Sequence, residues 1–453
     1  MSETTTTATD TPLRSIEKLY EEFLKHPVVT TDSRNVPPRS IFFALKGDNF
    51  DGNRFALDAL RQGAALAVVD DPEIKGEGIV QVPSVLRAFQ QLAHHHRCQL
   101  GTTVLAITGT NGKTTTKELI AAVLGKKYNV LYTQGNLNNH IGVPKTLLRL
   151  TKEHDIAVVE MGANHPGEIK TLTDIVFPDY GIITNVGRAH IEGFGSLEGV
   201  IKTKGELYDF LREDSGTVFI NNDNPHLAEI SQGLRLVRYG QTPSDQLLVQ
   251  GELTECNPFL KFRWKQQHSP FSPTEVQTHL IGSYNLDNML AAACVGTLFA
   301  VSSDDISEAL SEYVPSNNRS QLTETASNRL IVDAYNANPT SMAAALDSFA
   351  RIKADKKMVI LGDMKELGAS SQEEHEAILS KLSSLSLHDV WLVGSEFRKA
   401  LSATAPSAAI KTFADIEELK SFLQYSPADC PKNCTILIKG SNSTHLTDIL
   451  PLL

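Results

Sequence analysis

The stretch GTNGKTT at residues 109–115 constrains the fold of this chain more than any other feature. It follows an apolar run at residues 104–107, which we expect to be a strand, and it opens a helical-looking segment at residues 117–124. Glycines in such a turn let backbone N–H groups converge on phosphate oxygens, and a helix N-terminus adds partial positive charge. The chain is therefore expected to contain an α/β sheet with a phosphate-binding loop at its edge.

The residue types in this loop predict contacts with a nucleotide. We expect Lys113 to reach the terminal phosphates and the hydroxyl of Thr114 to hold Mg²⁺. The match is to the shorter GTNGKT form, because Ile107 stands where the longer phosphate-loop pattern has its first glycine. The predicted ATP contacts in the loop are Gly109, Thr110, Asn111, Gly112, Lys113, Thr114 and Thr115.

Length and composition indicate a soluble protein of several domains. The chain has 453 residues, and at about 150 residues per domain this suggests roughly three domains. No apolar run approaches the ~20 residues that cross a bilayer, so we expect no membrane insertion. The first ten residues lack the basic and apolar regions of a signal peptide, and we interpret them as a disordered start of a cytoplasmic protein.

The charge distribution narrows the range of partners. The net charge is −11, and no cluster of lysines and arginines is long enough to follow a polyphosphate, which argues against a nucleic-acid partner. An anionic small substrate would need local positive charge from loop amides, single basic residues and metal. The five cysteines have no paired spacing and are expected to be free thiols, and the three histidines at 94–96 are interpreted as a solvated helix face.

Apolar periodicity divides the chain into three parts. We place a small α/β domain at residues 1–100, a central ATP-binding domain at 101–316 and a C-terminal domain at 317–453, with the second boundary in the segment 315–318. Expected strands lie at 40–47, 65–69, 104–107, 155–160, 180–184, 260–265, 330–334, 358–361, 390–393 and 435–438. Expected helices lie at 16–24, 55–62, 85–100, 197–211, 285–300, 342–352 and 372–385. Continuous apolar strands that alternate with helices indicate parallel sheets, whereas 260–265 alternates as a half-exposed antiparallel strand does.

Three residues outside the loop could take part in chemistry. Glu160 ends an apolar strand, where a nucleotide-binding sheet commonly has an acidic metal ligand, although an exposed loop acid is the simpler alternative. His190 also follows a strand, and a lone histidine is more often structural. Lys204, like Lys202, lies in a helical segment where a solvated face explains most lysines. The residues alone therefore favour only Glu160, as a ligand.

Taken together, the motifs resemble those of the Mur ligases over nearly the whole chain. They are TDSR at 31–34, GTNGKTT at 109–115, GNLNN at 135–139, EMGAN at 160–164, TNVG at 184–187 with His190, KGE at 204–206, NND at 221–223, YN at 284–285 with Asn288, Arg319, DAYNANP at 333–339 and LGDMKELG at 361–368. Several are weak alone, but their order and spacing are specific. LGDMKELG most points to the member of the family that adds D-alanyl-D-alanine.

The resemblance implies an α/β enzyme with three domains and an ATP-dependent ligase reaction. A small α/β N-terminal domain would bind UDP, a central P-loop domain with a parallel sheet would be the ATPase, and a Rossmann-like C-terminal domain would close over the nucleotide. The implied partners are UDP-N-acetylmuramoyl-tripeptide and D-alanyl-D-alanine, joined through an acyl phosphate in peptidoglycan precursor synthesis. The implied cofactors are ATP and two Mg²⁺ ions, and we expect a monomer.

The resemblance also implies roles for residues at matching positions. Lys113, Glu160, His190 and Lys204 would be catalytic, with Lys204 N-carboxylated, and Thr114, Glu160, His190 and Lys204 would hold metal. Asn285, Arg319 and Asp333 would contact adenine or ribose. Ser33, Arg34, Lys46 and Gly47 would hold the uridine nucleotide, and Asn138 and Asn139 would face the substrate.

Two alternatives remain open at this point. One is a sister amide ligase that adds another amino acid to UDP-muramoyl peptides or glutamate to folate; LGDMKELG and the N-terminal TDSR weigh against it. The other is a binding module that hydrolyses ATP to switch conformation and needs no carboxylate acceptor. The chain also departs from many relatives near its C-terminus, where KGSNST at 439–444 lacks a following arginine, so contacts with the amino substrate stay unassigned there.

Overall fold

The computed structural model describes residues 11–267, 272–315, 319–403, 410–426 and 428–453. The predicted disordered start at 1–10 and residues 316–318 of the predicted boundary lie outside the described residues. The chain forms two compact units. The first unit comprises residues up to Ala106, Tyr128–Gly162 and Glu168–Asp179, and the second comprises Ile107–Lys127, Ala163–Gly167 and Tyr180–Leu453. Strand β7 (Thr103–Thr108) runs from the first unit into the second.

The first unit begins with a small sheet of order β1-β2-β5-β6, in which all three strand pairs are parallel. Its elements are α1 (Thr11–Lys25), β1 (Val29–Thr30), β2 (Ile41–Phe43), β3 (Lys46–Gly47), β4 (Phe50–Asp51), η1 (Gly52–Phe55), α2 (Ala56–Arg61), β5 (Leu66–Val69), β6 (Ile79–Gln81) and α3 (Val85–Leu100). Helix α3 begins where the Ser84 side chain accepts the Arg87 N–H and ends at left-handed Gly101. The start and stop signals thus define the helix that the sequence predicts.

Further along, the first unit contains β8 (Val130–Tyr132), α5 (Gly142–Leu147), β9 (Ile156–Glu160) and α6 (Glu168–Val176), with β8 and β9 parallel. The expectation of a solvated face at residues 94–96 is wrong. His96 is buried, with Nε2 2.9 Å from the Leu150 carbonyl oxygen, and His94 packs against the ring of Phe177. Burial lowers the pKa of His96, so this histidine belongs to the helix packing.

In the second unit, α4 (Lys113–Gly125) follows the GTNGKTT loop. The sheet order β15-β14-β13-β12-β11-β10 combines parallel pairs from β10 to β13 with antiparallel pairs from β13 to β15. These elements are β10 (Tyr180–Ile183), α7 (Ile191–Phe194), α8 (Leu197–Glu213), β11 (Thr217–Asn221), α9 (Pro225–Ile230), β12 (Arg235–Gly240), β13 (Leu247–Cys256), β14 (Phe259–Gln266), β15 (Thr274–Ile281), α10 (Asn285–Leu298) and α11 (Ser303–Glu312). The half-exposed antiparallel strand and the buried helix predicted here are confirmed as β14 and α10.

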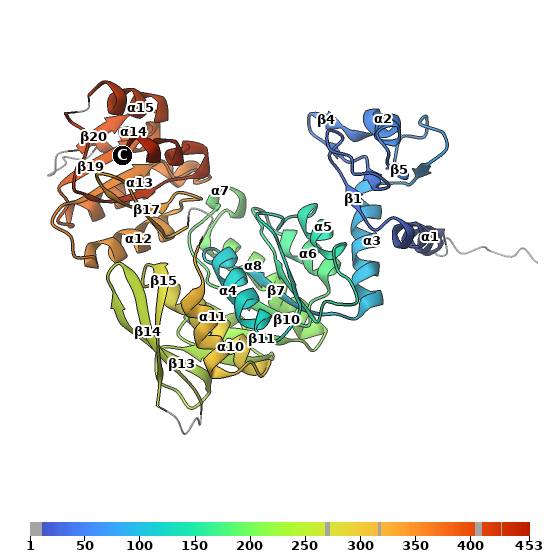
Figure 1. Ribbon diagram of the computed structural model, residues 1–453, viewed down its shortest axis with the longest axis horizontal. Helices are drawn as coiled ribbons and strands as arrows, with labels where there is room; N and C mark the ends of the chain where they lie inside the picture. Colours follow the sequence, from blue (N-terminus) through green and yellow to red (C-terminus); the bar gives the residue numbers. More distant parts are fainter. Residues whose placement is uncertain (1–10, 268–271, 316–318, 404–409, 427) are drawn as a thin grey trace, which may run out of the picture. The chain divides into compact units, whose positions relative to one another are not determined.

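The remaining sheet of the second unit, orange to dark red in Figure 1, has the order β16-β17-β21-β18-β19-β20. All its pairs are parallel except β16 with β17. The elements are β16 (Gln321–Glu324), β17 (Arg329–Asp333), α12 (Pro339–Arg351), β18 (Lys357–Gly362), η2 (Gly368–Ser370), α13 (Ser371–Ser383), β19 (Asp389–Val393), α14 (Ser395–Ala403), β20 (Ile410–Phe413), α15 (Ile416–Tyr425), β21 (Thr435–Lys439), η3 (Asn442–Thr444) and η4 (Leu446–Leu452).

This C-terminal sheet is covered on both faces. Val359 and Leu361 of β18 belong to the cluster with α12, α13 and α14, whereas Met358 and Ile360 belong to the cluster with α15 and η4. Successive residues of a strand point to opposite faces, which explains the continuous apolar runs of the sequence. Because neighbouring strands are parallel, the loops after β17, β21, β18 and β19 leave from the same edge, where α/β sheets commonly bind ligands.

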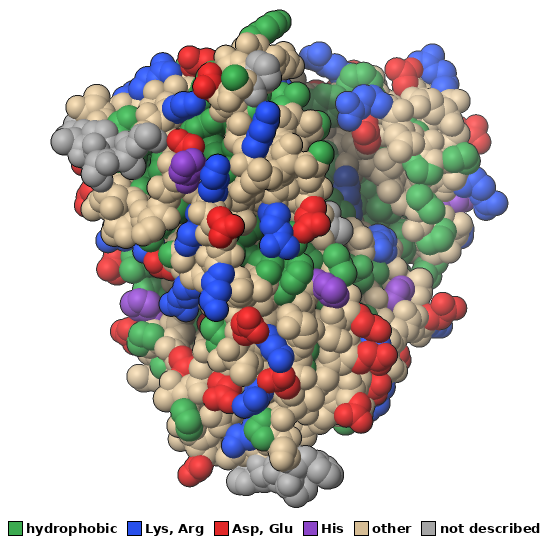
Figure 2. Space-filling model, turned by 60° about the vertical axis from the view of Figure 1, so that its left-hand side comes forward, with side chains coloured by type: hydrophobic (Ala, Val, Ile, Leu, Met, Phe, Trp, Pro, Cys, Tyr) green, Lys and Arg blue, Asp and Glu red, His purple; other side chains and the backbone are tan. Residues whose placement is uncertain are grey.

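The surface carries charges of both signs. On the face drawn in Figure 2, lysine and arginine side chains are interspersed with aspartate and glutamate, so positive charge on that face is local. The five cysteines are free, as the sequence predicts. In the described part of the chain, no helix is both long and apolar enough to span a bilayer.

Candidate functional site

The phosphate loop forms the sharp turn that its glycines predict. Gly112 is left-handed, with φ of 78°, and the first helical residue of α4 is Lys113. Gly109 has φ of 144°, and a Cβ atom at this position would lie 2.0 Å from Thr184 Oγ1. Backbone conformation and the close approach of Thr184 therefore both require glycine at position 109. The N–H groups at the start of α4 are set out as an anion-binding turn requires.

The side chains of the loop follow the predicted arrangement. Lys113 Nζ donates to the carbonyl oxygens of Gly109 and Thr110, at 2.7 and 3.1 Å, so the ammonium group lies over the turn. Thr114 and Thr115 are buried at the first turn of α4. A cation and a hydroxyl are thus held beside the helix N-terminus, which is the combination that phosphate and its metal need.

A second loop, TNVG at residues 184–187, braces the phosphate loop. Asn185 Oδ1 accepts the Asn111 N–H at 3.0 Å, and Asn185 Nδ2 donates to the Asn111 carbonyl, also at 3.0 Å. The Thr184 hydroxyl donates to the same carbonyl at 2.6 Å, and the Gly187 N–H donates to Thr110 Oγ1 at 3.0 Å. The sequence predicts TNVG only as a family motif, although its polar residues lie directly after a buried strand, which is a signal for this contact.

Helix α10 touches the loop from another side. The Thr116 hydroxyl donates to Asn288 Oδ1, Asn288 Nδ2 donates to Asn285 Oδ1, and Asn285 Nδ2 donates to the Ile281 carbonyl. Asn285 therefore uses both ends of its amide inside the protein and is buried. The contact of Asn285 with the nucleotide stays a prediction. To make this contact, the Asn285 side chain would have to give up its hydrogen bond to Asn288 or to Ile281.

Lys204 is buried, so a solvated helix face does not explain it. Only 2% of the residue is exposed, Nζ donates to the Ala163 carbonyl at 3.3 Å, and the same atom lies 5.2 Å from the centre of the Phe194 ring. Lys202, two residues earlier on α8, is exposed. Residues two apart on a helix face nearly opposite directions, which could have separated the two lysines at the sequence level.

His190 stands at the start of α7 with a left-handed backbone, φ of 50°. Its Nδ1 lies 2.5 Å from Glu366 Oε2, and hydrogen bonding from His190 lowers the pKa of the Glu366 carboxyl. Sequence reasoning gave no role to Glu366, because the two residues are far apart in the chain. His190, Lys204 and the phosphate loop all belong to the second unit.

Glu160 belongs to the first unit and is buried at the end of β9. Asn138 Nδ2 donates to its Oε1 at 2.8 Å, and the Thr133 hydroxyl accepts its N–H. An exposed loop acid is therefore excluded for Glu160. The neighbouring Asn139 uses its side-chain oxygen to accept the N–H groups of Ile141 and Gly142 at the start of α5, so that oxygen shapes a turn.

The residues predicted to hold the uridine nucleotide follow two adjacent strands of the first sheet. Ser33 and Arg34 come after β1, and Lys46 and Gly47 come after β2, at the edge where parallel strands end. The Arg34 guanidinium donates to both carboxylate oxygens of Asp32 and holds the pKa of Asp32 down to about 2. Lys46 Nζ lies 2.8 Å from Asp70 Oδ1.

The remaining predicted nucleotide contacts lie around the C-terminal sheet. The Arg319 guanidinium carbon is 3.8 Å from the centre of the Tyr335 ring. Asp333 ends β17, and its Oδ2 accepts a 2.6 Å contact from Lys439 Nζ, which is buried on the neighbouring strand β21. The Asp333 carboxylate is thereby held at the strand-end edge of this sheet.

The donor set fits a magnesium ion only in part. Among the described residues, no group of three histidine, cysteine, aspartate or glutamate side chains is arranged to hold a metal. Mg²⁺ commonly binds through one or two carboxylates together with substrate phosphates and water, so the Thr114 hydroxyl in the second unit and the Glu160 carboxylate in the first unit are each an oxygen of a suitable type. The Lys204 ammonium would repel the ion, and it becomes a suitable ligand only as a carbamate.

Three family models cover most of the chain. The Mur ligase family catalytic domain matches residues 27–97, the Mur ligase middle domain matches 107–296, and the Mur ligase glutamate ligase domain matches 318–442.

Individual relatives are similar over almost their whole length. UDP-N-acetylmuramoyl-tripeptide–D-alanyl-D-alanine ligase of Bacillus subtilis is 34% identical, over 95% of this chain and 93% of the relative. The crystal structure of MurF from Acinetobacter baumannii has a TM-score of 0.84 at 32% identity and covers 93% of this chain and 92% of that one. MurF ligase of Thermotoga maritima in complex with ADP has a TM-score of 0.83 at 26% identity, with 94% and 96% covered.

Proposed function

The chain belongs to the Mur ligase family, and we propose that it joins D-alanyl-D-alanine to UDP-N-acetylmuramoyl-tripeptide with hydrolysis of ATP, in peptidoglycan precursor synthesis. The observation that carries the proposal is that the similarity to the ligase of this name extends over 95% of the chain. The phosphate loop, braced by residues 184–187, supplies the ATP site that such a reaction needs.

The reaction follows from the chemistry of carboxylates. A free carboxylate is a poor acyl donor, so one carboxylate oxygen of the tripeptide attacks the γ-phosphorus of ATP, and ADP leaves. The amine of D-alanyl-D-alanine then adds to the acyl carbon of the resulting acyl phosphate and loses a proton. The tetrahedral intermediate collapses to an amide and inorganic phosphate, which carries away the carboxylate oxygen. Lys113 stabilises negative charge on the transferring phosphoryl group.

The metal site is part of the proposal. Thr114, Glu160, His190 and Lys204 would hold two Mg²⁺ ions, with Lys204 converted to a carbamate. When bound, the ions neutralise charge on the phosphate oxygens. Burial of the Lys204 side chain beside Ala163 and Phe194 supports this assignment, because a lysine is almost never fully buried unless it has a partner.

The binding residues are assigned from their match to the motifs of the Mur ligase family. Asn285, Arg319 and Asp333 contact adenine or ribose, Ser33, Arg34, Lys46 and Gly47 hold the uridine nucleotide, and Asn138 and Asn139 face the substrate. The position of the second group after adjacent parallel strands supports a shared binding edge. We also propose a cytoplasmic monomer with domain boundaries near residues 100 and 316.

An ADP-release assay tests the proposal. The purified protein is incubated with ATP and Mg²⁺ in the presence of the UDP-tripeptide, of D-alanyl-D-alanine or of both, and the product is identified by its mass. We expect sustained ADP release and UDP-pentapeptide only with both substrates. Equal ADP release without either substrate would identify an ATPase switch, and product formation with a different amino acid in preference to D-alanyl-D-alanine would identify a sister ligase.

A further inference from the structure

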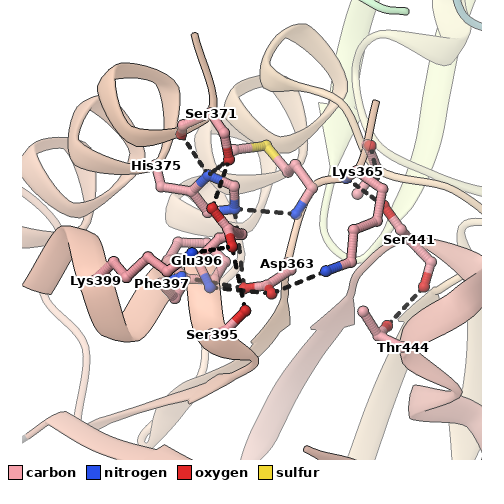
Figure 3. A network of polar contacts seen from close by, with 12 residues as sticks. Asp363, Lys365, Ser371, His375, Ser395, Glu396, Phe397, Lys399, Ser441 and Thr444 are labelled. Carbon is pink, nitrogen blue, oxygen red and sulfur yellow. Dashed lines mark hydrogen bonds and ion pairs between the residues drawn. The ribbon is translucent and has the colours of Figure 1, made fainter. Parts of the chain in front are cut away.

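The loop at residues 363–368, which follows β18, is fixed by the buried Asp363 (Figure 3). The Asp363 carboxylate accepts the N–H groups of Glu396 and Phe397, at 3.1 and 3.0 Å, and so caps the start of α14. It also lies 3.2 Å from Lys365 Nζ. A carboxylate with these three donors holds the first part of the loop in place.

Further hydrogen bonds tie the same loop to its surroundings. The Met364 N–H donates to His375 Nε2 at 3.1 Å, and the Lys365 N–H donates to Ser441 Oγ at 3.0 Å (Figure 3). The Ser441 N–H donates to the Asp363 carbonyl at 3.2 Å. Three consecutive residues of the loop are therefore bonded to three different elements, and the next residue, Glu366, is presented from a rigid base.

Glu366 faces the segment that begins with His190. Its Oε2 lies 2.5 Å from His190 Nδ1, and its carbonyl accepts the Glu192 N–H at 3.3 Å. Both Glu366 and His190 have a left-handed backbone, with φ of 63° and 50°. Such conformations cost about 1 kcal/mol or more for residues other than glycine, so they persist where the surroundings determine them.

Two more contacts hold the stretch at 185–194 against the C-terminal part of the second unit. The Arg188 guanidinium donates to Glu374 Oε1 at 2.9 Å, and the Arg188 N–H donates to Thr340 Oγ1 at 3.1 Å. The same stretch begins with Asn185, which braces the phosphate loop. The C-terminal part is thus connected through one short segment both to His190 and to the ATP site.

We propose that Glu366 is a positioning residue for His190, so that docking of the loop at 363–368 sets the orientation of the imidazole. A carboxylate held against Nδ1 restricts rotation of the ring and leaves Nε2 as the nitrogen that is available to a ligand. Glu366 then links the position of the C-terminal part to the readiness of the candidate metal site. This inference rests on the proposed function, in which His190 acts at the metal.

The competing explanation is an ordinary surface ion pair, since half of the Glu366 side chain is exposed. Such a pair contributes about 0–1 kcal/mol to stability and has no effect on a reaction. The two explanations differ in one respect. If Glu366 acts through His190, removing Glu366 has no further effect once His190 is gone, because residues that act as a unit are not additive.

The test uses Glu366→Ala, Glu366→Gln, His190→Ala and the double variant Glu366→Ala/His190→Ala in the full-length protein. The matched control is Glu376→Gln, which removes the same charge from α13, where Glu376 accepts a hydrogen bond from Gln372 of its own helix. We measure kcat and KM, the affinity for Mn²⁺ by calorimetry in the presence of a non-hydrolysable ATP analogue, and the thermal midpoint.

We expect Glu366→Ala to lower kcat or Mn²⁺ affinity about 10–100-fold, the usual effect of losing a group that orients a metal-binding histidine. Glu366→Gln, whose amide oxygen still accepts from Nδ1, should stay within a few-fold of wild type, and the control should match wild type. The double variant should equal His190→Ala. The inference would be overturned by additive losses in the double variant, or by wild-type kcat and Mn²⁺ affinity in Glu366→Ala. In either case an active wild-type protein would leave the proposed function intact. A wild-type protein without ligase activity would instead overturn the proposed function.

Discussion

At the scale of single residues, the buried Lys204 carries the strongest chemical information. Lys204 is only 2% exposed, its Nζ donates to a backbone carbonyl, and the same atom lies close to an aromatic ring. The exposed Lys202 on the same helix is its natural counterpart. The two lysines differ in burial and not in chemistry, so a comparison of their alanine variants isolates the function of the site.

Lys204→Ala should lower turnover by about 10²–10³-fold, the range for loss of one group that stabilises charge in a transition state. ATP binding, which depends on the phosphate loop, should remain close to wild type. Lys202→Ala should behave as wild type in both respects. Steady-state kinetics and equilibrium binding of a fluorescent ATP analogue check the two statements. Equal turnover in the two variants would remove Lys204 from the mechanism.

Gly109→Ala should abolish ATP binding while leaving the rest of the fold intact. The added Cβ would meet Thr184 Oγ1, and φ of 144° costs a residue with a side chain about 1–3 kcal/mol. Gly125→Ala is the control, because it ends α4 and a Cβ there meets no heavy atom within 4 Å. Calorimetric titration with ATP measures both variants. An ATP affinity of Gly109→Ala equal to that of Gly125→Ala would show that the loop tolerates a side chain here.

At the scale of elements, the candidate site depends on hydrogen bonds between loops, such as those between residues 184–187 and the phosphate loop. The sequence identifies β7, α4 and the glycine turn, because periodicity and local composition determine them. It does not identify the brace at 184–187 or the Asp363 network, since these depend on pairing between residues far apart in the chain. The short strands β16 and β20 were also missed, because a run of four residues is too short to show a distinctive period.

Asn185→Ala should weaken ATP binding about 10-fold. The variant loses two hydrogen bonds to Asn111, each contributing about 0.5–1.5 kcal/mol, and a less ordered loop binds phosphate less well. Asn224→Ala, which removes the side-chain cap of α9, controls for a general loss of stability. Unfolding in urea and nucleotide titration should show similar destabilisation in the two variants but a weaker affinity only in Asn185→Ala.

His375 on α13 makes the stability of the C-terminal sheet depend on pH. Burial lowers the pKa of this histidine, whose Nε2 accepts the Met364 N–H. As pH falls below about 6.5, the unfolded chain gains a proton that the folded chain resists, so the free energy of unfolding decreases. The decrease for this one group is limited to about 1.4 kcal/mol per pH unit.

Urea unfolding at pH 7.5 and pH 5.5 measures this dependence. In His375→Gln, the free energy of unfolding should fall less between pH 7.5 and pH 5.5 than in the wild type. In the control His388→Gln, which changes an exposed histidine, it should fall as much as in the wild type. Burial also lowers the pKa of His96 in the first unit, so the free energy of unfolding of His375→Gln should still decrease somewhat at low pH. An unchanged slope in His375→Gln would contradict this account of the histidine.

At the scale of the whole molecule, the sequence predicted the fold class well and the relations between distant residues poorly. The parallel strand pairs of the second unit, the antiparallel β14 and the buried α10 all follow from apolar periodicity. The resemblance to Mur ligases supplied roles for His190 and Lys204 that the residues alone did not indicate. The structure adds that both side chains belong to the second unit and that Lys204 is buried.

The central claim is that ATP activates the tripeptide carboxylate as an acyl phosphate. It is tested most directly with UDP-N-acetylmuramoyl-tripeptide carrying ¹⁸O in its terminal carboxylate, with D-alanyl-D-alanine, ATP and Mg²⁺, followed by mass analysis of the released phosphate. The account predicts that the phosphate contains one carboxylate oxygen for each amide bond formed. Product formation with unlabelled phosphate would contradict it, because the carboxylate oxygen would then have left by another route.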